Sequence, residues 1–154
     1  MENARELLRH ALATIAYRAT RALDGAPAEF AEFDGAGRKP VEILAHMGDL
    51  FDWALSMAKG ELAWHHSKPR EWSAEKERFF AALQAFDAYL ASSEMLHAPM
   101  DRLFQAPIAD ALTHVGQLAM MRRLAGCKIQ GENYYVAAIA IGQLAEQPEP
   151  VRTF

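Results

Sequence analysis

Four stretches of about twenty residues carry apolar side chains at spacings of three and four, and this repeat constrains the fold more than any other feature of the chain. Such a spacing places the apolar residues on one face of an α-helix. The stretches are residues 3–23, 40–59, 73–93 and 107–125. Each forms a helix about 30 Å long, and helices of similar length bury their apolar faces against one another. The sequence therefore predicts an all-α four-helix bundle formed by a single domain, residues 1–154.

Proline, glycine and serine mark the expected ends of these helices. Pro40 and Pro107 suit the first position of a helix, where the missing N–H is not needed. Ser73 is a good N-cap for the third helix, and Gly60 and Gly126 fit just past helix ends. Long connections join the helices. The C-terminal extension after Gly126 is expected to pack on the bundle, although its short apolar run does not distinguish a helix from an extended chain.

Composition and charge exclude several classes of protein. The chain has 154 residues, of which 51% are hydrophobic and 23% charged, as in ordinary globular domains. A formal net charge of −4 provides no basic stripe for nucleic acid and no polybasic patch for anionic lipid. One cysteine cannot form an internal disulfide, and we find no signal-peptide pattern. No window of about 18 residues is continuously apolar, so we expect a cytoplasmic protein that binds neither nucleic acid nor membranes.

Two of the predicted helices carry a histidine and an aspartate on one face. Asp110 and His114 are four residues apart on the last helix, and His46 and Asp49 are three apart on the second. Both pairs adjoin apolar positions, so both are expected to point toward the bundle interior. A buried imidazole or carboxylate needs a partner because its desolvation is costly. The two pairs can satisfy one another, or they can jointly hold a metal ion, as side chains on facing helices do in other bundles.

Four neighbouring residues are candidates for supporting such a site. Asp49 could accept the second ring N–H of His46 or act as a ligand itself. Gln117 could orient bound water. Trp53 and Met121 could wall a pocket, but a place in the ordinary core is at least as consistent with their helical spacing.

The remaining polar residues favour structural roles. The pair His65-His66 is typical of a surface connection. Cys127 has no histidine near it in sequence, so we interpret it as structural. Glu132, which follows Gly131, favours a turn, with a segment that reaches back over the site as the alternative.

Two short motifs resemble the DinB-like superfamily. The segment ADALTHVGQLA, residues 109–119, resembles the last bundle helix of that family, and LAHMGDL, residues 44–50, resembles its second helix. Trp72 before the third helix and the order of elements fit the same plan. The resemblance covers roughly residues 3–125.

The resemblance implies a four-helix bundle, often a homodimer, in which three histidines hold a metal ion. One histidine comes from the second helix and two, spaced HxxxH, come from the fourth. His46 matches the first and His114 the last, whereas Asp110 stands where the family has its other histidine. Aspartate is also a competent ligand, so the resemblance implies one divalent ion (zinc, nickel or iron) on two imidazoles and one carboxylate, with positions open to water or substrate.

The resemblance also implies a reaction class. Related proteins look like metal-dependent thiol (S-)transferases, in which the metal lowers the pKa of a low-molecular-weight thiol and the thiolate attacks the second substrate. The sequence assigns no catalytic role beyond the three ligands. The alternative is a non-catalytic binding or dimerisation module, in which His46, Asp110 and His114 form a buried network without a metal.

Overall fold

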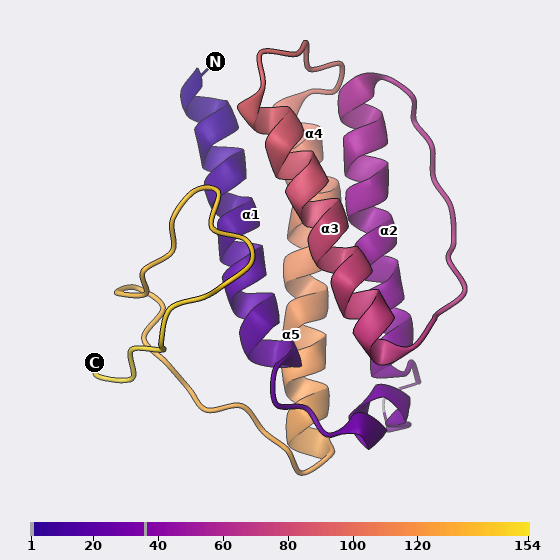
Figure 1. Cartoon of the computed structure of the whole chain (residues 1–154), viewed down its shortest axis with the longest axis vertical. Helices are drawn as coiled ribbons and strands as arrows, with labels where there is room; N and C mark the ends of the chain where they lie inside the picture. Colours follow the sequence, from indigo (N-terminus) through magenta and orange to yellow (C-terminus); the bar gives the residue numbers. More distant parts are fainter. Residues whose placement is uncertain (1, 36) are drawn as a thin grey trace.

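The computed structural model of the chain, which describes residues 2–35 and 37–154, is a bundle of long helices (Figure 1). Its main helices are α1 (Glu2–Leu23), α2 (Pro40–Lys59), α3 (Trp72–Ala91) and α5 (Ala109–Leu124), and a short 3-10 helix, η1 (Ala28–Glu32), precedes α2. No strand occurs in this part of the chain. The predicted all-α bundle is therefore confirmed. Within the same residues, no helix combines the length and the apolar character needed to cross a membrane.

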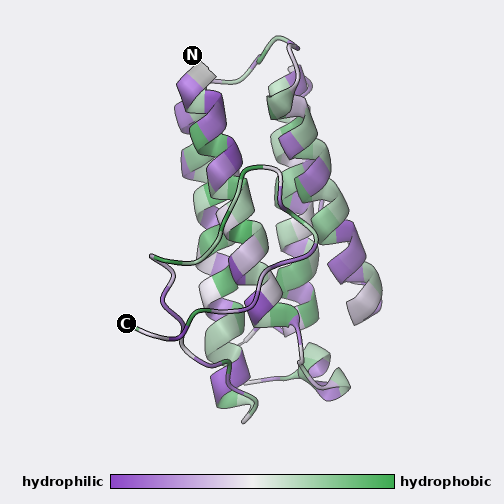
Figure 2. Ribbon diagram, turned by 60° about the vertical axis from the view of Figure 1, so that its left-hand side comes forward, coloured by the Kyte–Doolittle hydropathy of each residue, from purple (hydrophilic) through white to green (hydrophobic). Residues whose placement is uncertain are grey.

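The core is formed by apolar side chains from all four main helices. Three phenylalanines, Phe51, Phe79 and Phe86, pack around one another at the α2–α3 contact, with ring centroids 5.9 and 6.4 Å apart from Phe51. Leu12 and Leu118 complete this layer from α1 and α5. Figure 2 shows hydrophobic positions recurring along each helix between hydrophilic ones. This pattern is the spatial form of the three- and four-residue repeat in the sequence.

The helices α2 and α3 run in the same direction, so the chain must return along the full length of the bundle between them (Figure 1). A 20-residue helix such as α2 is about 30 Å long. The connection, residues 61–71, is here called the strap. An extended chain spans at most about 3.3–3.6 Å per residue, so eleven residues cover this distance only if they are nearly straight. Bundle topology therefore forces the strap to lie along the outside of α2.

The ends of α2 follow the sequence signals, whereas α3 begins differently from the prediction. Pro40 is at the first position of α2, and Gly60 follows its last turn in a left-handed conformation with φ of 85°. Ser73 does not cap α3, because the helix already includes Trp72. The buried carboxylate of Glu75 instead accepts the backbone N–H of Arg70 at 2.9 Å, which ties the strap to the first turn of α3.

The fourth bundle helix begins earlier than the proline suggested, and the prediction that Pro107 starts it is wrong. Helical structure begins at α4 (Met100–Leu103), continues through the π-helical turn η2 (Phe104–Ile108), and leads directly into α5. Pro107 lies inside the π turn. A proline within an α-helix lacks an N–H and its ring clashes with the carbonyl four residues earlier. A π turn widens the helix by one residue at this point, so the chain accommodates the ring without breaking the rod.

The segment after α5 returns alongside α1 (Figure 1). Its Leu144 is buried in the hydrophobic core. Its Glu132 is also buried, and the prediction of a simple turn at this position missed that contact: Oε2 accepts the hydroxyl of Tyr17 at 2.5 Å, and Oε1 accepts Nε of Arg21 at 3.1 Å. Burial raises the pKa of Tyr17, and the carboxylate it faces raises it further. The tyrosine therefore stays protonated and serves as a permanent donor to Glu132.

Candidate metal centre

The candidate centre lies between α2 and α5. His46 projects from α2, and Asp110 and His114 project from the first turns of α5. Oδ2 of Asp110 lies 3.4 Å from Nε2 of His46 and 3.5 Å from Nε2 of His114. The two imidazole rings meet edge to face, with centroids 4.8 Å apart. One ligand atom from each residue lies within 4.8 Å of the others. The structure thus brings together the three residues that helical spacing placed on facing helices.

Exposure increases from one side of the cluster to the other. The side chain of His114 is 9% exposed, that of His46 is 20% exposed and that of Asp110 is 45% exposed. Burial lowers the pKa of His46, and the nearby His114 and Arg38 add to this lowering, while the contact with Asp110 opposes it. His46 is therefore neutral near pH 7 and offers a nitrogen lone pair. Asp110 leaves the cluster open toward solvent.

Gln117 fixes the ring orientation and the tautomer of His114. Nδ1 of His114 lies 2.7 Å from Oε1 of Gln117, and because an amide oxygen only accepts, Nδ1 must carry the proton. The other ring nitrogen, Nε2, faces the carboxylate of Asp110 at 3.5 Å. A cation or a proton between these two atoms would satisfy both. Gln117 therefore has the position that a support for a metal-ligating histidine takes.

Two of the three distances between the ligand atoms match those around a transition metal. Metal–nitrogen and metal–oxygen bonds of about 2.1 Å at tetrahedral angles place two ligand atoms about 3.4 Å apart. The two imidazole–carboxylate distances are 3.4 and 3.5 Å, and all three atoms lie within 4.8 Å of one another. Two imidazoles and one carboxylate suit zinc, nickel and iron(II). The donor set and these two distances therefore fit the metal that the family resemblance implies.

The other residues proposed to surround the centre have different positions. Trp53 lines a hollow of about 350 Å³ together with Asp110, so it lies beside the centre. Met121 is 2% exposed and belongs to the hydrophobic core. Asp49 does not contact His46: its carboxylate accepts the backbone N–H and the hydroxyl of Ser67 at 2.8 and 2.6 Å. Asp49 therefore holds the strap, and the expectation that it supports His46 is replaced by this role.

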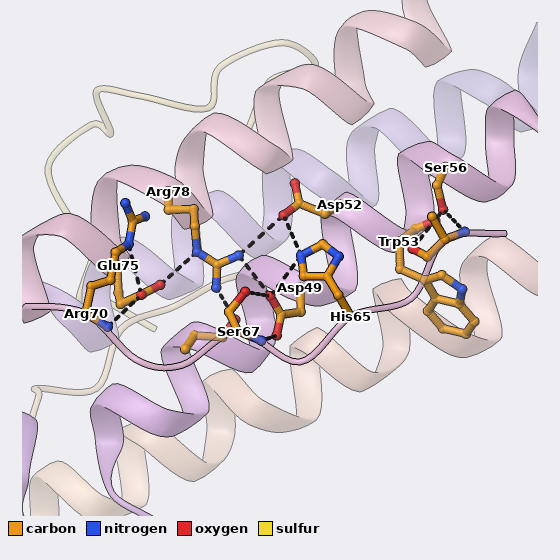
Figure 3. A network of polar contacts seen from close by, with 11 residues as sticks. Asp49, Asp52, Trp53, Ser56, His65, Ser67, Arg70, Glu75 and Arg78 are labelled. Atoms are coloured by element: carbon orange, nitrogen blue, oxygen red, sulfur yellow. Dashed lines mark hydrogen bonds and ion pairs between the residues drawn. The ribbon is translucent and has the colours of Figure 1, made fainter. Parts of the chain in front are cut away.

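Asp49 belongs to an ionic network that fastens the strap to α2 and α3 (Figure 3). The guanidinium of Arg78 on α3 donates to Asp49 at 3.0 Å, to Asp52 at 3.3 Å and to Glu75 at 2.9 Å. It also donates to the backbone carbonyl of Ala45 at 2.6 Å. Burial alone would raise the pKa of Asp49, but its hydrogen bonds from Ser67 and Arg78 outweigh burial and hold that pKa below its usual range. Asp49 is therefore charged, and the strap is held in a defined position.

A second group of potential ligands, Asp49, Asp52 and His65, lies in this network. The Nε2 atom of His65 is 3.5 and 3.6 Å from the two carboxylates. The guanidinium of Arg78 already donates to both. A metal ion would have to replace that cation and leave Arg78 buried without its partners, which is costly. We therefore interpret this group as an ion-pair network.

The strap brings an aromatic side chain to the metal centre that the sequence did not reveal. The indole of Trp64 meets His46 edge to face at 5.8 Å and Trp53 at 5.4 Å. It donates its N–H to Nε2 of His66 at 3.2 Å. Both His65 and His66 are exposed, as expected for a surface connection. No periodic pattern predicts Trp64, because the strap has no helix or strand.

Two hollows flank the centre. The first is the 350 Å³ hollow at Asp110, whose wall is largely apolar: Leu50, Trp53, Ala106 and Ala109. The second, of about 490 Å³, lies between α2 and the strap, and its lining includes His46, Arg38, Glu42 and His66. A ligand can therefore approach the candidate centre along two chemically different surfaces.

No protein-family model, curated protein or solved structure matches this chain with significance.

Proposed function

We propose that the chain binds one divalent transition-metal ion through His46, Asp110 and His114 and is a metal-dependent enzyme acting on a small molecule. The observation that carries the proposal is the set of ligand distances: one carboxylate oxygen lies 3.4 and 3.5 Å from two imidazole nitrogens on two helices. The neutral state of His46 and the hydrogen bond that orients the ring of His114 add to it, because a metal-ligating imidazole is neutral and held in place by a second contact. The motif resemblance to the DinB-like superfamily supports the same residues.

The number of ligands favours a catalytic site over a structural one. Structural zinc sites are closed by four protein ligands, whereas catalytic sites use three and leave a position for water or substrate. The described residues supply three ligands here, and the partly exposed carboxylate of Asp110 faces the open side.

The proposed reaction is a thiol (S-)transfer, as the resemblance implies. A bound divalent metal would supply the positive charge that keeps a small thiol deprotonated. The protein residues have defined tasks around it: Gln117 holds the ring of His114, and Trp64, which packs on Trp53, covers one edge of His46. The apolar hollow at Asp110 can receive the electrophilic second substrate.

Elemental analysis of protein purified without an affinity tag tests the metal site. We expect about one equivalent of zinc, nickel or iron in the wild type and its loss in His114→Ala. His66→Ala is the matched control, because His66 lies in the adjacent strap but outside the cluster, and it should retain the metal. Metal-free wild type after reconstitution at neutral pH, or full retention in His114→Ala, contradicts the proposal.

The same variants test the alternative of a non-catalytic module. The mutual contacts of the three side chains could also form a buried network held by shared protons. In that case the double variant His46→Ala/His114→Ala binds no less metal than the wild type. It loses stability instead, by about 1–3 kcal/mol for each buried group left unpaired.

A further inference from the structure

The 490 Å³ hollow beside His46 is a formed pocket with a fixed wall. One side consists of the first turns of α2 and the residues before it, including Arg38 and Glu42. The other side is the strap, whose Ser67 is bound to Asp49 through both its backbone N–H and its hydroxyl. The volume is within the range of small-molecule sites. Because His46 lines the pocket directly, a molecule bound there contacts one of the three candidate ligands.

The acidic groups of this pocket are already engaged. Asp49 accepts two hydrogen bonds from Ser67 and one from Arg78. Glu42 accepts the backbone N–H of Lys39 at 2.7 Å, as part of the capping box that starts α2. These hydrogen bonds come from the protein itself, so neither carboxylate needs a cation as a further partner.

Arg38 is the charged group of the pocket without such an engagement. Within the described part of the chain, its guanidinium forms no ion pair and no side-chain hydrogen bond, in contrast to that of Arg78, which donates to Asp49. An exposed guanidinium at the rim of a pocket that ends at a candidate reactive centre is well placed to bind an anion.

We propose that Arg38 recognises a carboxylate on the substrate, so that the pocket takes a small monoanionic ligand whose carboxylate lies at Arg38 and whose reacting end lies at His46. This inference rests on the proposed function, because the reacting end is taken to meet the metal. One guanidinium close to Glu42 neutralises a single negative charge, whereas a phosphate dianion would leave one charge uncompensated beside that acid. The pocket therefore favours carboxylates over phosphate monoesters.

The test uses a matched pair of thiols and the cobalt(II)-loaded protein. The ligands 3-mercaptopropionate and 3-mercaptopropionamide have the same size and thiol but differ in charge, and thiolate binding to cobalt gives a charge-transfer absorption. We expect the wild type to bind the anion about tenfold more tightly than the amide, as one charge-assisted hydrogen-bonded pair provides. Arg38→Gln should abolish the preference and Arg38→Lys should keep part of it. Arg123→Gln, which removes an exposed arginine at the far end of α5, should leave the preference unchanged.

The outcomes separate this inference from the metal proposal. Equal binding of both thiols by the cobalt-loaded wild type, or a preference that survives in Arg38→Gln, overturns the role of Arg38 while the metal site stands. If the wild type retains no cobalt, the metal proposal fails, and calorimetry with propionate and propionamide then decides the role of Arg38 without a metal. A propionate preference that Arg38→Gln removes supports the role, and its absence overturns it.

Discussion

At the scale of single residues, the candidate centre depends on which nitrogen carries a proton. Gln117 accepts the Nδ1 proton of His114 and so turns Nε2 toward Asp110. Burial keeps His46 neutral by lowering its pKa. Both rings are therefore held in place without a metal, and a metal ion would spend less binding energy on ordering them.

The first prediction concerns Gln117. Replacing it by leucine removes the acceptor that orients His114, and we expect metal affinity to fall by about 10- to 100-fold, the usual cost of losing a support to a ligating histidine. Competition with a chromophoric chelator measures the affinity. The fold should be unaffected because Gln117 is exposed. Gln130→Leu, at an exposed position on the segment after α5, is the control, and an equal loss in both variants would refute the role of Gln117.

At the scale of elements, two irregular segments are fixed to the bundle by buried charges. The strap is held by Arg78 and its carboxylates, and the segment after α5 is held by Tyr17, Arg21 and Glu132. In both cases a charged group is shielded from water and fully paired. Removing one partner from such a group costs more than the pair contributes, because the other is left uncompensated.

The second prediction follows from the pKa values of the strap network. Hydrogen bonds hold the pKa of Asp49 and Glu75 below their ordinary values of 3.8 and 4.5, although burial opposes this. As the pH falls, the unfolded chain takes up protons first, so the stability that these groups contribute is complete above those ordinary values and is lost as the pH falls through the lowered pKa. Urea denaturation of the wild type between pH 7 and 3 should show this loss below about pH 4.5.

Substitution of Arg78 by methionine should reverse this dependence of stability on pH. At pH 7 it leaves buried carboxylates unpaired, and we expect a loss of about 3–5 kcal/mol in the free energy of unfolding. Protonation relieves those carboxylates, so the difference from the wild type should shrink on acidification. Lys39→Met breaks an exposed pair with Glu32 and should cost at most about 1 kcal/mol. A pH-independent difference for Arg78→Met would show that the network is not what holds the strap.

The third prediction concerns the segment after α5. Tyr17→Phe removes the hydroxyl that donates to the buried Glu132, and we expect the protein to lose about 1–3 kcal/mol of stability. Hydrogen exchange should speed up first in residues 128–150, because that is the segment the bond retains. Tyr135→Phe is the control, since Tyr135 is 96% exposed. Unchanged exchange in Tyr17→Phe would mean that the Arg21–Glu132 pair and the burial of Leu144 hold the segment without this bond.

The bundle helices could be predicted from the sequence, whereas the contacts that attach the strap and the segment after α5 could not. Helical spacing is local, so it revealed the four bundle helices and placed His46, Asp110 and His114 on facing sides. The partners of Asp49 lie on the strap and on α3, and no local pattern joins them. Glu132 belongs to a segment without periodicity, so its burial was invisible. That the three brought-together residues hold a metal stays a prediction.

At the scale of the whole molecule, the proposed metal between α2 and α5 would link two elements far apart in the chain. A ligand that binds only the folded state stabilises it by mass action, by about 2.7 kcal/mol at a free concentration one hundred times its dissociation constant. For a chain of this size that corresponds to a rise of roughly 5–10 °C in the unfolding temperature.

The fourth prediction is therefore a thermal shift. Calorimetry of the wild type with saturating zinc should show a higher unfolding temperature than after chelation, and His114→Ala should show no difference between the two conditions. Asp52→Ala tests the second group of potential ligands and should keep the full shift, because Arg78 already occupies that position. A shift that disappears in Asp52→Ala and persists in His114→Ala would place the metal at Asp49, Asp52 and His65 and contradict the prediction.

The π-helical turn at Phe104–Ile108 offsets the directions of the side chains on α5 from those on α4. Each residue of an α-helix turns the rod by about 100°, so the extra residue in this turn rotates α5 relative to α4 without bending the chain away. Leu103 before the turn and Ile108 at its end are both fully buried, and Asp110 and His114 are directed at α2. Deleting one residue from the turn, together with Pro107→Ala so that the helix stays continuous, would turn Asp110 and His114 to a different side. The direction of Asp110 and His114 is thus set by the extra residue in the turn before them. The number of residues in this turn matters as much as their identity.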